Sequence, residues 1–178
     1  MKNQTLVAEI REILPKESSG RYDLLPVFAE GKLFHNIVKH IAARFATEQI
    51  DLVAAPEALG FILGAAVAER LGVGFLGLRK AERLPYKKEA LQIESYDTDY
   101  TKTEKTLGIY KKSDVAGKRI LLIDEWIETG VTMQACKKLL ETRGAKIIGI
   151  GTIGADLQTP QVKQWYEESY LYAIGTDI

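Results

Sequence analysis

Residues 119–133, Arg-Ile-Leu-Leu-Ile-Asp-Glu-Trp-Ile-Glu-Thr-Gly-Val-Thr-Met, decide how this chain folds and where its chemistry lies. The apolar run Ile120–Ile123 has β-branched residues at both ends and predicts a strand that is buried on both faces. Two acids, Asp124 and Glu125, follow at the carboxyl end of that strand, which is where open α/β sheets bind ligands. The stretch therefore predicts a ligand site at this end of the strand.

The loop after the acids has the features of a phosphate site. Thr129, Gly130 and Thr132 lead into a helical pattern that runs over residues 131–143 and closes at Gly144. Backbone N–H groups at a helix N-terminus, together with two hydroxyl groups, bind phosphate through hydrogen bonds and the helix dipole. Carboxylates beside such a loop suit a sugar phosphate, because sugar hydroxyls need acceptors and the phosphate needs donors.

Two other interpretations of this segment are possible. A buried strand that ends in Asp-Glu also fits the Walker B strand of an ATPase, but the chain has no Gly-x-x-x-x-Gly-Lys-Ser/Thr loop to hold a nucleoside triphosphate. The segment also fits an ordinary strand-to-helix turn, in which Asp and Thr serve as helix caps. The remaining segments decide between this plain turn and a ligand site.

Length and composition exclude several classes of protein. The 178 residues predict one domain, and 46% apolar with 27% charged residues is typical of a globular chain. Lys plus Arg and Asp plus Glu both number 24, and this balance favours no nucleic-acid partner. Cys136 falls inside a helical pattern and is expected to be buried, while His35 and His40 have no neighbouring ligands for a structural metal.

Neither a membrane partner nor secretion is expected. The longest apolar run, residues 58–68, is too short to span a bilayer, and the N-terminus lacks the apolar region of a signal peptide. We expect a cytoplasmic protein.

Strand and helix patterns alternate along the chain, which predicts the α/β class with a central, mainly parallel sheet and helices on both faces. The expected strands are residues 50–55, 74–78, 119–123 and 145–154, with an edge strand near 170–173; the expected helices are 33–47, 61–71, 131–143 and 161–168. A long polar stretch, residues 79–118, contains two segments that could pair as a hairpin, 90–96 and 107–111. Such long insertions often act as lids.

The segment of residues 120–132 resembles the phosphoribosyl diphosphate (PRPP) signature of type I phosphoribosyltransferases: four apolar residues, two acids, a short spacer and Thr-Gly-x-Thr. The resemblance implies the type I phosphoribosyltransferase fold. It further implies that Asp124 and Glu125 hold the ribose hydroxyls of PRPP. The 5′-phosphate would lie against Glu128, Thr129, Gly130, Val131 and Thr132.

Residues 51–65 resemble the second signature of the adenine phosphoribosyltransferase subfamily, where a strand, a tight turn and a helix N-terminus bind pyrophosphate. Glu57, Ala58, Leu59 and Gly60 occupy the positions of that turn. Gly60 permits close approach of the backbone, and the helix start favours anions. The subfamily usually carries an arginine where this chain has Leu59, so one cationic contact to pyrophosphate is missing.

Residues 77–86 resemble the basic segment of the same subfamily, and Arg79, Lys80 and Arg83 match its cationic positions. The resemblance implies that all three bind pyrophosphate. Arg79 and Lys80 are also catalytic candidates, because positive side chains stabilise the charge that develops on the departing pyrophosphate. A solvated basic loop is the alternative.

Two acids are further catalytic candidates. Residues 94–100 resemble the mobile catalytic loop of the subfamily, with Asp99 at the position of its glutamate and with Tyr96 and Tyr100 as lid residues; a plain surface turn is the alternative. Glu128 departs from the adenine pattern. The 6-oxopurine relatives carry an Asp there that faces the purine N7, which would suit acid–base chemistry at the base.

The resemblance implies one phosphoribosyltransferase domain, residues 1–178. Its expected parts are an N-terminal hood (1–34), a core (35–155) that carries a long flexible lid (79–118), and a C-terminal helix and edge strand (156–178). In the hood, Tyr22 or Phe28 could stack on a base, although core packing is the simpler role.

We expect transfer of ribose 5-phosphate from PRPP to a purine base, with adenine favoured, in purine salvage. Mg²⁺ is the expected cofactor, bound through the substrate with no direct protein ligand, and the family is commonly homodimeric. The alternatives are a 6-oxopurine phosphoribosyltransferase and a non-catalytic sensor of PRPP or nucleotides on the same fold. The loss of an arginine at Leu59 favours the sensor, whereas Arg79, Lys80 and the two ribose acids favour the enzyme.

Overall fold

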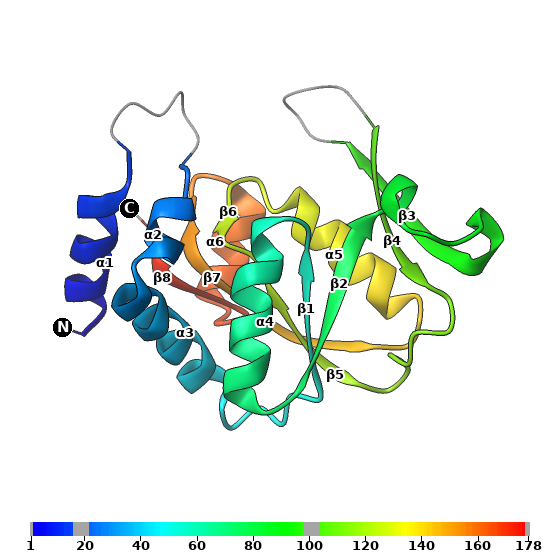
Figure 1. Ribbon diagram of the computed structural model, residues 1–178, viewed down its shortest axis with the longest axis horizontal. Coiled ribbons are helices and arrows are strands. Elements are labelled where there is room, and N and C mark those ends of the chain that lie inside the picture. Colours follow the sequence, from blue (N-terminus) through cyan, green and yellow to red (C-terminus); the bar gives the residue numbers. More distant parts are fainter. Residues whose placement is uncertain (1, 16–21, 98–103, 177–178) are drawn as a thin grey trace.

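The computed structural model describes residues 2–15, 22–97 and 104–176 (Figure 1). Within these residues an eight-stranded sheet forms the centre of the molecule. Its strands are β1 Leu52–Pro56, β2 Gly74–Lys80, β3 Leu91–Asp97, β4 Glu104–Tyr110, β5 Arg119–Ile123, β6 Trp126–Ile127, β7 Lys146–Ala155 and β8 Leu171–Gly175. The spatial order is β3-β4-β2-β1-β5-β7, and β6 and β8 both pair with β7. The pairings of β3 and β4 are antiparallel and the others are parallel, which confirms the predicted, mainly parallel sheet.

Helices cover both faces of this sheet (Figure 1). One face carries α1 Lys2–Ile13, α2 Leu25–Ala29, α3 Gly31–Phe45 and α4 Leu59–Leu71, and the other carries α5 Val131–Glu141 and α6 Pro160–Glu167. Two short 3₁₀ helices, η1 Ala81–Arg83 and η2 Lys88–Ala90, connect β2 to β3. Among the described residues, none of the helices combines the length and the apolar character that crossing a bilayer requires.

The alternation of side chains along the central strands explains the two helical layers. Ile120 and Leu122 of β5 pack into the core beneath α5 and α6, whereas Leu121 and Ile123 pack into the core beneath α1–α4. All four side chains are fully buried. A strand whose neighbouring residues face opposite sides must be apolar throughout when both faces are covered, so β5 is the doubly buried strand that its sequence predicts.

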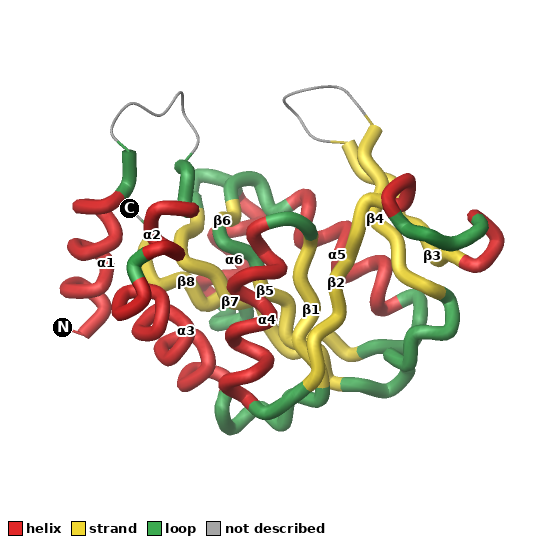
Figure 2. The backbone as a smooth tube through the Cα atoms, viewed as in Figure 1, coloured by secondary structure: helices red, strands yellow, loops and turns green. Residues whose placement is uncertain are grey.

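The polar stretch after β2 forms the expected hairpin, which extends from the sheet in Figure 2. β3 and β4 pair antiparallel along their whole length, and β4 also pairs with the end of β2 at Arg79 and Lys80. The hairpin also packs against α5. It therefore connects the cationic end of β2 to the helix that follows the signature loop.

Helix ends differ from the predicted ones by about two residues. α4 begins at Leu59 rather than at residue 61, which places Leu59 and Gly60 in its first turn, and it ends as predicted at Gly72, whose φ is 71°. α5 ends at Glu141 rather than at residue 143, because the following turn tightens: the N–H of Arg143 donates to the carbonyl of Leu140 at 3.0 Å.

The N-terminal helices α1 and α2 were not predicted. Leu6, Ile10 and Leu14 are the buried apolar residues of the first helical segment, and they form a narrow stripe with one residue per turn. Such a stripe gives a weak helical signal in a sequence that is otherwise polar. The helix is therefore evident from its packing against α3 and β8 rather than from its composition.

Candidate active site

Asp124 and Glu125 lie in a short break between two strand segments. β5 ends at the residue before Asp124 and β6 begins at the residue after Glu125, and both segments pair with β7 in the same register from Leu121 onward, after a register shift between Ile120 and Leu121. The N–H of Asp124 donates to the carbonyl of Gly151 at 3.2 Å, and the N–H of Gly154 donates to the carbonyl of Glu125 at 3.4 Å. The backbone of both acids is thus held in place by the central sheet.

The two carboxyl groups interact strongly with each other. Burial raises the pKa of Asp124 well above the ordinary carboxyl value, and Glu125 raises it further through its charge and a side-chain hydrogen bond. The backbone N–H of Glu125 donates to Oδ1 of Asp124 at 3.0 Å, which offsets part of that rise in pKa. Oε2 of Glu125 is buried and has no hydrogen-bond partner within the described part of the chain. A buried acceptor of this kind is suited to a donor from a ligand, such as a sugar hydroxyl.

The loop of residues 128–132 forms a sharp turn at the N-terminus of α5. Gly130 has a φ of 78° and caps the helix, which begins at Val131. A Cβ atom at Gly130 would lie 3.0 Å from Trp165 and 3.1 Å from Val162, so the loop packs directly against α6. Thr159 of the same region donates its hydroxyl to the carbonyl of Glu128 at 3.2 Å. The predicted phosphate loop is therefore a packed turn at a helix N-terminus, the geometry that favours an anion.

The predicted pyrophosphate turn lies directly beside the acids. The peptide bond between Glu57 and Ala58 is cis, and α4 starts at Leu59 with Ala58 as its N-cap residue. A Cβ atom at Gly60 would lie 3.1 Å from Oδ1 of Asp124, so the first turn of α4 is in contact with the carboxyl group. The fold thus brings the second predicted signature, far away in sequence, against the first.

The predicted cations stand at the end of β2 and just beyond it. Arg79 and Lys80 are the last residues of β2, and Arg83 ends η1. Nε of Arg79 donates to Oε2 of Glu57 at 3.4 Å, and a terminal nitrogen of Arg83 donates to Oε1 of the same carboxylate at 3.3 Å. The side chain of Glu57 is 8% exposed, against 40% for Arg79 and 57% for Arg83. These two arginines are therefore gathered on one nearly buried acid.

The hairpin reaches the phosphate loop through Tyr96. Burial raises the pKa of the Tyr96 hydroxyl, and a side-chain hydrogen bond with Thr132 partly lowers it; the thiol of Cys136 and the carboxyl of Asp124 lie close enough to raise it further. Lys138 of α5 forms an ion pair with Glu94 of β3 at 2.5 Å, which also fastens the hairpin to this helix. Asp99 and Tyr100, the other predicted lid residues, lie outside the described residues.

An aromatic pair next to the acids was not identified from the sequence as a unit. The rings of Tyr22 and Trp126 lie 4.5 Å apart, and Trp126 directly follows Glu125. The indole covers Gly154, because a Cβ atom there would lie 2.0 Å from Cζ3 of Trp126. Tyr22 is 42% exposed, whereas Phe28 packs against Phe34, and both are partly buried against the core. The position of Trp126 immediately after the two predicted ribose acids was the signal that could have revealed it.

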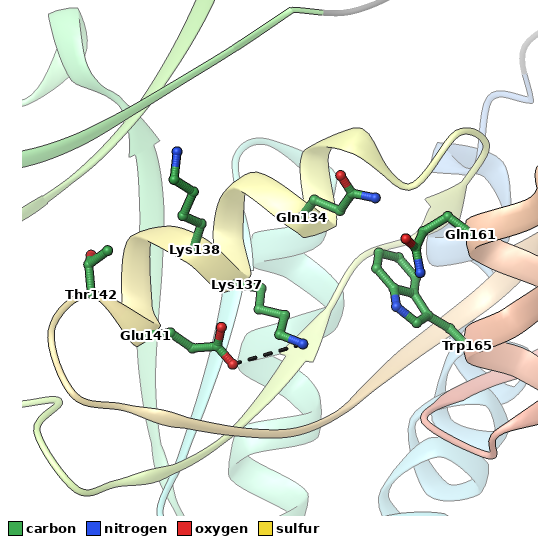
Figure 3. A pocket seen from close by; sticks show the side chains of 7 residues that line it. All are labelled: Gln134, Lys137, Lys138, Glu141, Thr142, Gln161 and Trp165. Carbon is green, nitrogen blue, oxygen red and sulfur yellow. Dashed lines mark ion pairs between the residues drawn. The ribbon is translucent and has the colours of Figure 1, made fainter.

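A groove of about 500 Å³ lies away from the acids, along α5 and the start of α6 (Figure 3). Its lining residues are Gln134, Lys137, Lys138, Glu141, Thr142, Gln161 and Trp165. Its two lysines are engaged by carboxylates, Lys137 by Glu141 at 3.9 Å and Lys138 by Glu94 at 2.5 Å. The groove is thus charge-balanced, and the convergent polar groups lie instead at the ends of β1, β2 and β5.

Comparison with known proteins identifies the family. The family described as phosphoribosyl transferase domain matches residues 28–173. An adenine phosphoribosyltransferase from Maridesulfovibrio salexigens is 39% identical over 146 residues, which is 81% of this chain and 83% of that protein.

Solved structures are similar over almost the whole chain. The crystal structure of adenine phosphoribosyltransferase from Thermoanaerobacter pseudethanolicus has a TM-score of 0.82 and 27% identity, and the match covers 96% of this chain and 99% of that chain. The structure of APRTase from Giardia lamblia complexed with 9-deazaadenine has a TM-score of 0.82 and 26% identity, and the match covers 97% of this chain and 98% of that chain. With the family match over residues 28–173 and this shared fold, the chain belongs to the phosphoribosyltransferase family.

Proposed function

We propose that the protein transfers ribose 5-phosphate from PRPP to adenine, forming a nucleoside monophosphate and releasing pyrophosphate, as in purine salvage. The observation that carries this proposal is the contact of Gly60 with Asp124, which joins the turn at α4 to the acids after β5. The α5 N-terminus follows those acids, so three anion- or hydroxyl-binding elements meet at one edge of the sheet. One PRPP molecule requires all three, because it carries a diol, a monophosphate and a pyrophosphate.

The ribose would lie against the two acids. Oε2 of Glu125 is a buried acceptor without a hydrogen-bond partner among the described residues, and Asp124 beside it completes a pair of oxygen acceptors for the 2′- and 3′-hydroxyls. The 5′-phosphate would lie on the turn of residues 128–132, where Gly130 opens the N-terminus of α5. The side chain of Glu128 would point toward the base, since a carboxylate repels the adjacent phosphate.

The pyrophosphate would lie between the start of α4 and the cations at the end of β2. Breaking the bond between C1′ and the pyrophosphate oxygen leaves an anion on the leaving group and positive charge on the ribose. Arg79, Lys80 and Arg83 would stabilise the departing anion more in the transition state than in the ground state. Asp99 remains a predicted catalytic acid of the lid outside the described residues.

The donors present fit Mg²⁺ bound chiefly through the substrate. Asp124 and Glu125 form a carboxylate pair beside the expected ribose. Mg²⁺ keeps several waters and binds through one or two carboxylates and substrate phosphates. When bound, it would neutralise charge on the pyrophosphate.

The aromatic pair supports a planar base. Trp126 follows the ribose acids in the chain, and Tyr22 packs on it at 4.5 Å with nearly half of its surface exposed. Aromatic rings beside the sugar site provide the stacking surface that a purine requires. The relatives named adenine phosphoribosyltransferase and the complex with 9-deazaadenine favour adenine over other bases.

A homodimer is part of this proposal. α4 is apolar around most of its circumference, and Ile62 on its outer side is 43% exposed. A helix that is apolar on all sides is normally covered, so a second copy would bury this surface. Sedimentation of the purified protein tests this point, and a monomeric mass would contradict it.

The decisive experiment measures pyrophosphate release from PRPP and Mg²⁺, with adenine, hypoxanthine, guanine, xanthine, orotate and uracil assayed in parallel. Release with adenine is expected, and Glu125→Gln should abolish most of it while the protein remains folded. Pyrophosphate release with hypoxanthine or guanine instead of adenine would show that the substrate is a 6-oxopurine. That result would assign the base-facing role to Glu128. No release with any base, together with measurable PRPP binding, would indicate a sensor.

A further inference from the structure

Glu57 places a carboxylate inside the cluster that is proposed to bind pyrophosphate. Its Oε2 accepts a hydrogen bond from Arg79 at 3.4 Å and its Oε1 accepts one from Arg83 at 3.3 Å. The side chain of Glu57 is only 8% exposed. An acid weakens an anion site by repulsion, so its presence at this position requires an explanation.

The contacts fix where the two guanidinium groups lie. The N–H of Glu57 donates to the carbonyl of Leu78 at 3.0 Å, which joins the end of β1 to the end of β2 immediately before Arg79. Arg83 stands on η1, a helix of three residues without any buried residue. The ion pair with Glu57 therefore joins this exposed arginine to the residue that directly follows β1.

The same contacts leave most donors of the arginines available. Each guanidinium carries five N–H groups, and in the described part of the chain the contact with Glu57 uses one nitrogen of each arginine. Taken together, the two arginines and the glutamate carry a net charge of about +1. A nearly buried carboxylate is stable only when cationic partners bind it, and the two arginines supply them. The cluster therefore stabilises the buried charge of Glu57 and still carries net positive charge.

We propose that Glu57 is a positioning residue, which holds Arg79 and Arg83 at the N-terminus of α4 so that their remaining donors are available to pyrophosphate. This role rests on the proposed function of the site. Glu57 acts on the anion through the arginines rather than by contact with it.

The experiment compares wild-type protein with Glu57→Gln, Glu57→Asp, Arg83→Met and the double variant Glu57→Gln/Arg83→Met. Glu48→Gln is the matched control, because Glu48 pairs with Arg44 at 3.3 Å before the amino end of β1, whereas Glu57 follows the carboxyl end of that strand. The measured quantities are the Kd of pyrophosphate with Mg²⁺ by calorimetry, KM for PRPP and for adenine, and Tm. Glu57→Gln should weaken pyrophosphate binding and raise KM for PRPP by about tenfold each, with KM for adenine unchanged.

Two further outcomes separate positioning from a merely structural role. Glu57→Asp should recover part of the pyrophosphate affinity, since the charge is kept and the reach is shortened. In the Arg83→Met background, Glu57→Gln should change pyrophosphate affinity by less than about threefold, because part of its effect passes through Arg83. A full tenfold effect in that background would overturn the proposed route.

Pyrophosphate affinity that is unchanged or tighter in a folded Glu57→Gln variant would overturn the proposal, and tighter binding would identify Glu57 as a competing anion. A wild-type protein that does not bind pyrophosphate would also overturn it. A wild-type protein that binds pyrophosphate but releases none from PRPP with any base would contradict the proposed function alone, and the variants would still decide the role of Glu57.

Discussion

Oδ1 of Asp124 lies 3.1 Å from the position that a Cβ atom on Gly60 would occupy. The first turn of α4 and the acid after β5 are therefore in contact at one point, with no room for a side chain between them. Contact at this distance places the positive end of a helix dipole beside a buried carboxyl group. Asp124 thus links the two halves of the proposed PRPP site.

Gly60→Ala should weaken PRPP binding with little loss of stability. The added methyl group would also lie 3.3 Å from Pro56 and 3.5 Å from Ala55, so the carboxyl group of Asp124 is the neighbour that has to move. We expect KM for PRPP to rise about fivefold, which corresponds to about 1 kcal/mol. Steady-state kinetics and thermal melting measure the two effects.

Gly31→Ala is the matched control for this substitution. A Cβ atom at Gly31, the first residue of α3, would meet nothing within 4 Å. Alanine there should leave KM unchanged and keep or slightly raise Tm, because it reduces the freedom of the unfolded chain. Equal KM values for Gly60→Ala and the wild type would show that Asp124 can shift without loss of function.

Asp124→Asn should abolish tight PRPP binding and alter how stability depends on pH. Loss of a charge-assisted hydrogen bond to the ribose should weaken PRPP binding by about a hundredfold, or about 2–3 kcal/mol. Burial and Glu125 raise the pKa of Asp124 in the folded protein above its ordinary value of 3.8. The unfolded chain therefore ionises at lower pH than the folded protein, and stability from this group falls as pH rises from 3.8 through the folded pKa.

Asparagine does not titrate, so the stability of Asp124→Asn relative to the wild type should increase with pH across that window. Thermal melting of both proteins between about pH 4 and pH 8 measures the difference. Asp114→Asn serves as the control, because it makes the same substitution at a side chain that is 80% exposed. A difference in Tm between Asp124→Asn and the wild type that stays constant with pH would contradict the raised pKa.

Local sequence patterns predicted the helices and strands in which buried and exposed side chains follow a regular pattern along the chain. The strand Arg119–Ile123 has its predicted bounds because four consecutive apolar residues are buried on two faces. The glycines that end α4 and follow α5 have positive φ values, 71° at Gly72 and 80° at Gly144, which a sequence signals directly. These features depend on neighbours within a few positions of the chain.

Features that depend on distant neighbours could not be predicted in the same way. The two arginines that engage Glu57 lie 22 and 26 residues further along the chain. The packing of Tyr22 on Trp126 likewise depends on how the N-terminal segment folds over β6. A side-chain contact of this kind follows from tertiary structure and not from local propensity.

Tyr96→Phe should loosen the coupling between the hairpin and the phosphate loop. The substitution removes the hydrogen bond between the Tyr96 hydroxyl and Thr132 and keeps the aromatic ring. One neutral hydrogen bond contributes about 0.5–1.5 kcal/mol, so KM for PRPP should rise about threefold. Hydrogen exchange should become faster in β3. Tyr86→Phe is the control, because Tyr86 stacks on Tyr110 through its ring at 4.5 Å; equal effects of the two substitutions would argue against this coupling.

Leu59→Arg should lower KM for PRPP, because it adds a cation at the first residue of α4, beside the turn that holds Glu57. Leu59 is partly exposed, so an arginine side chain can extend toward solvent without entering the core. We expect pyrophosphate to bind about tenfold more tightly, the gain of one additional charged hydrogen bond. Leu59→Met keeps the size without the charge and should match the wild type.

Turnover of Leu59→Arg should rise only if binding of PRPP limits the rate, and it should fall if release of pyrophosphate limits the rate. If Leu59→Arg leaves both pyrophosphate affinity and KM for PRPP unchanged, Arg79 and Arg83 already supply the cationic contacts that pyrophosphate needs. The leucine at this position would then not weaken binding.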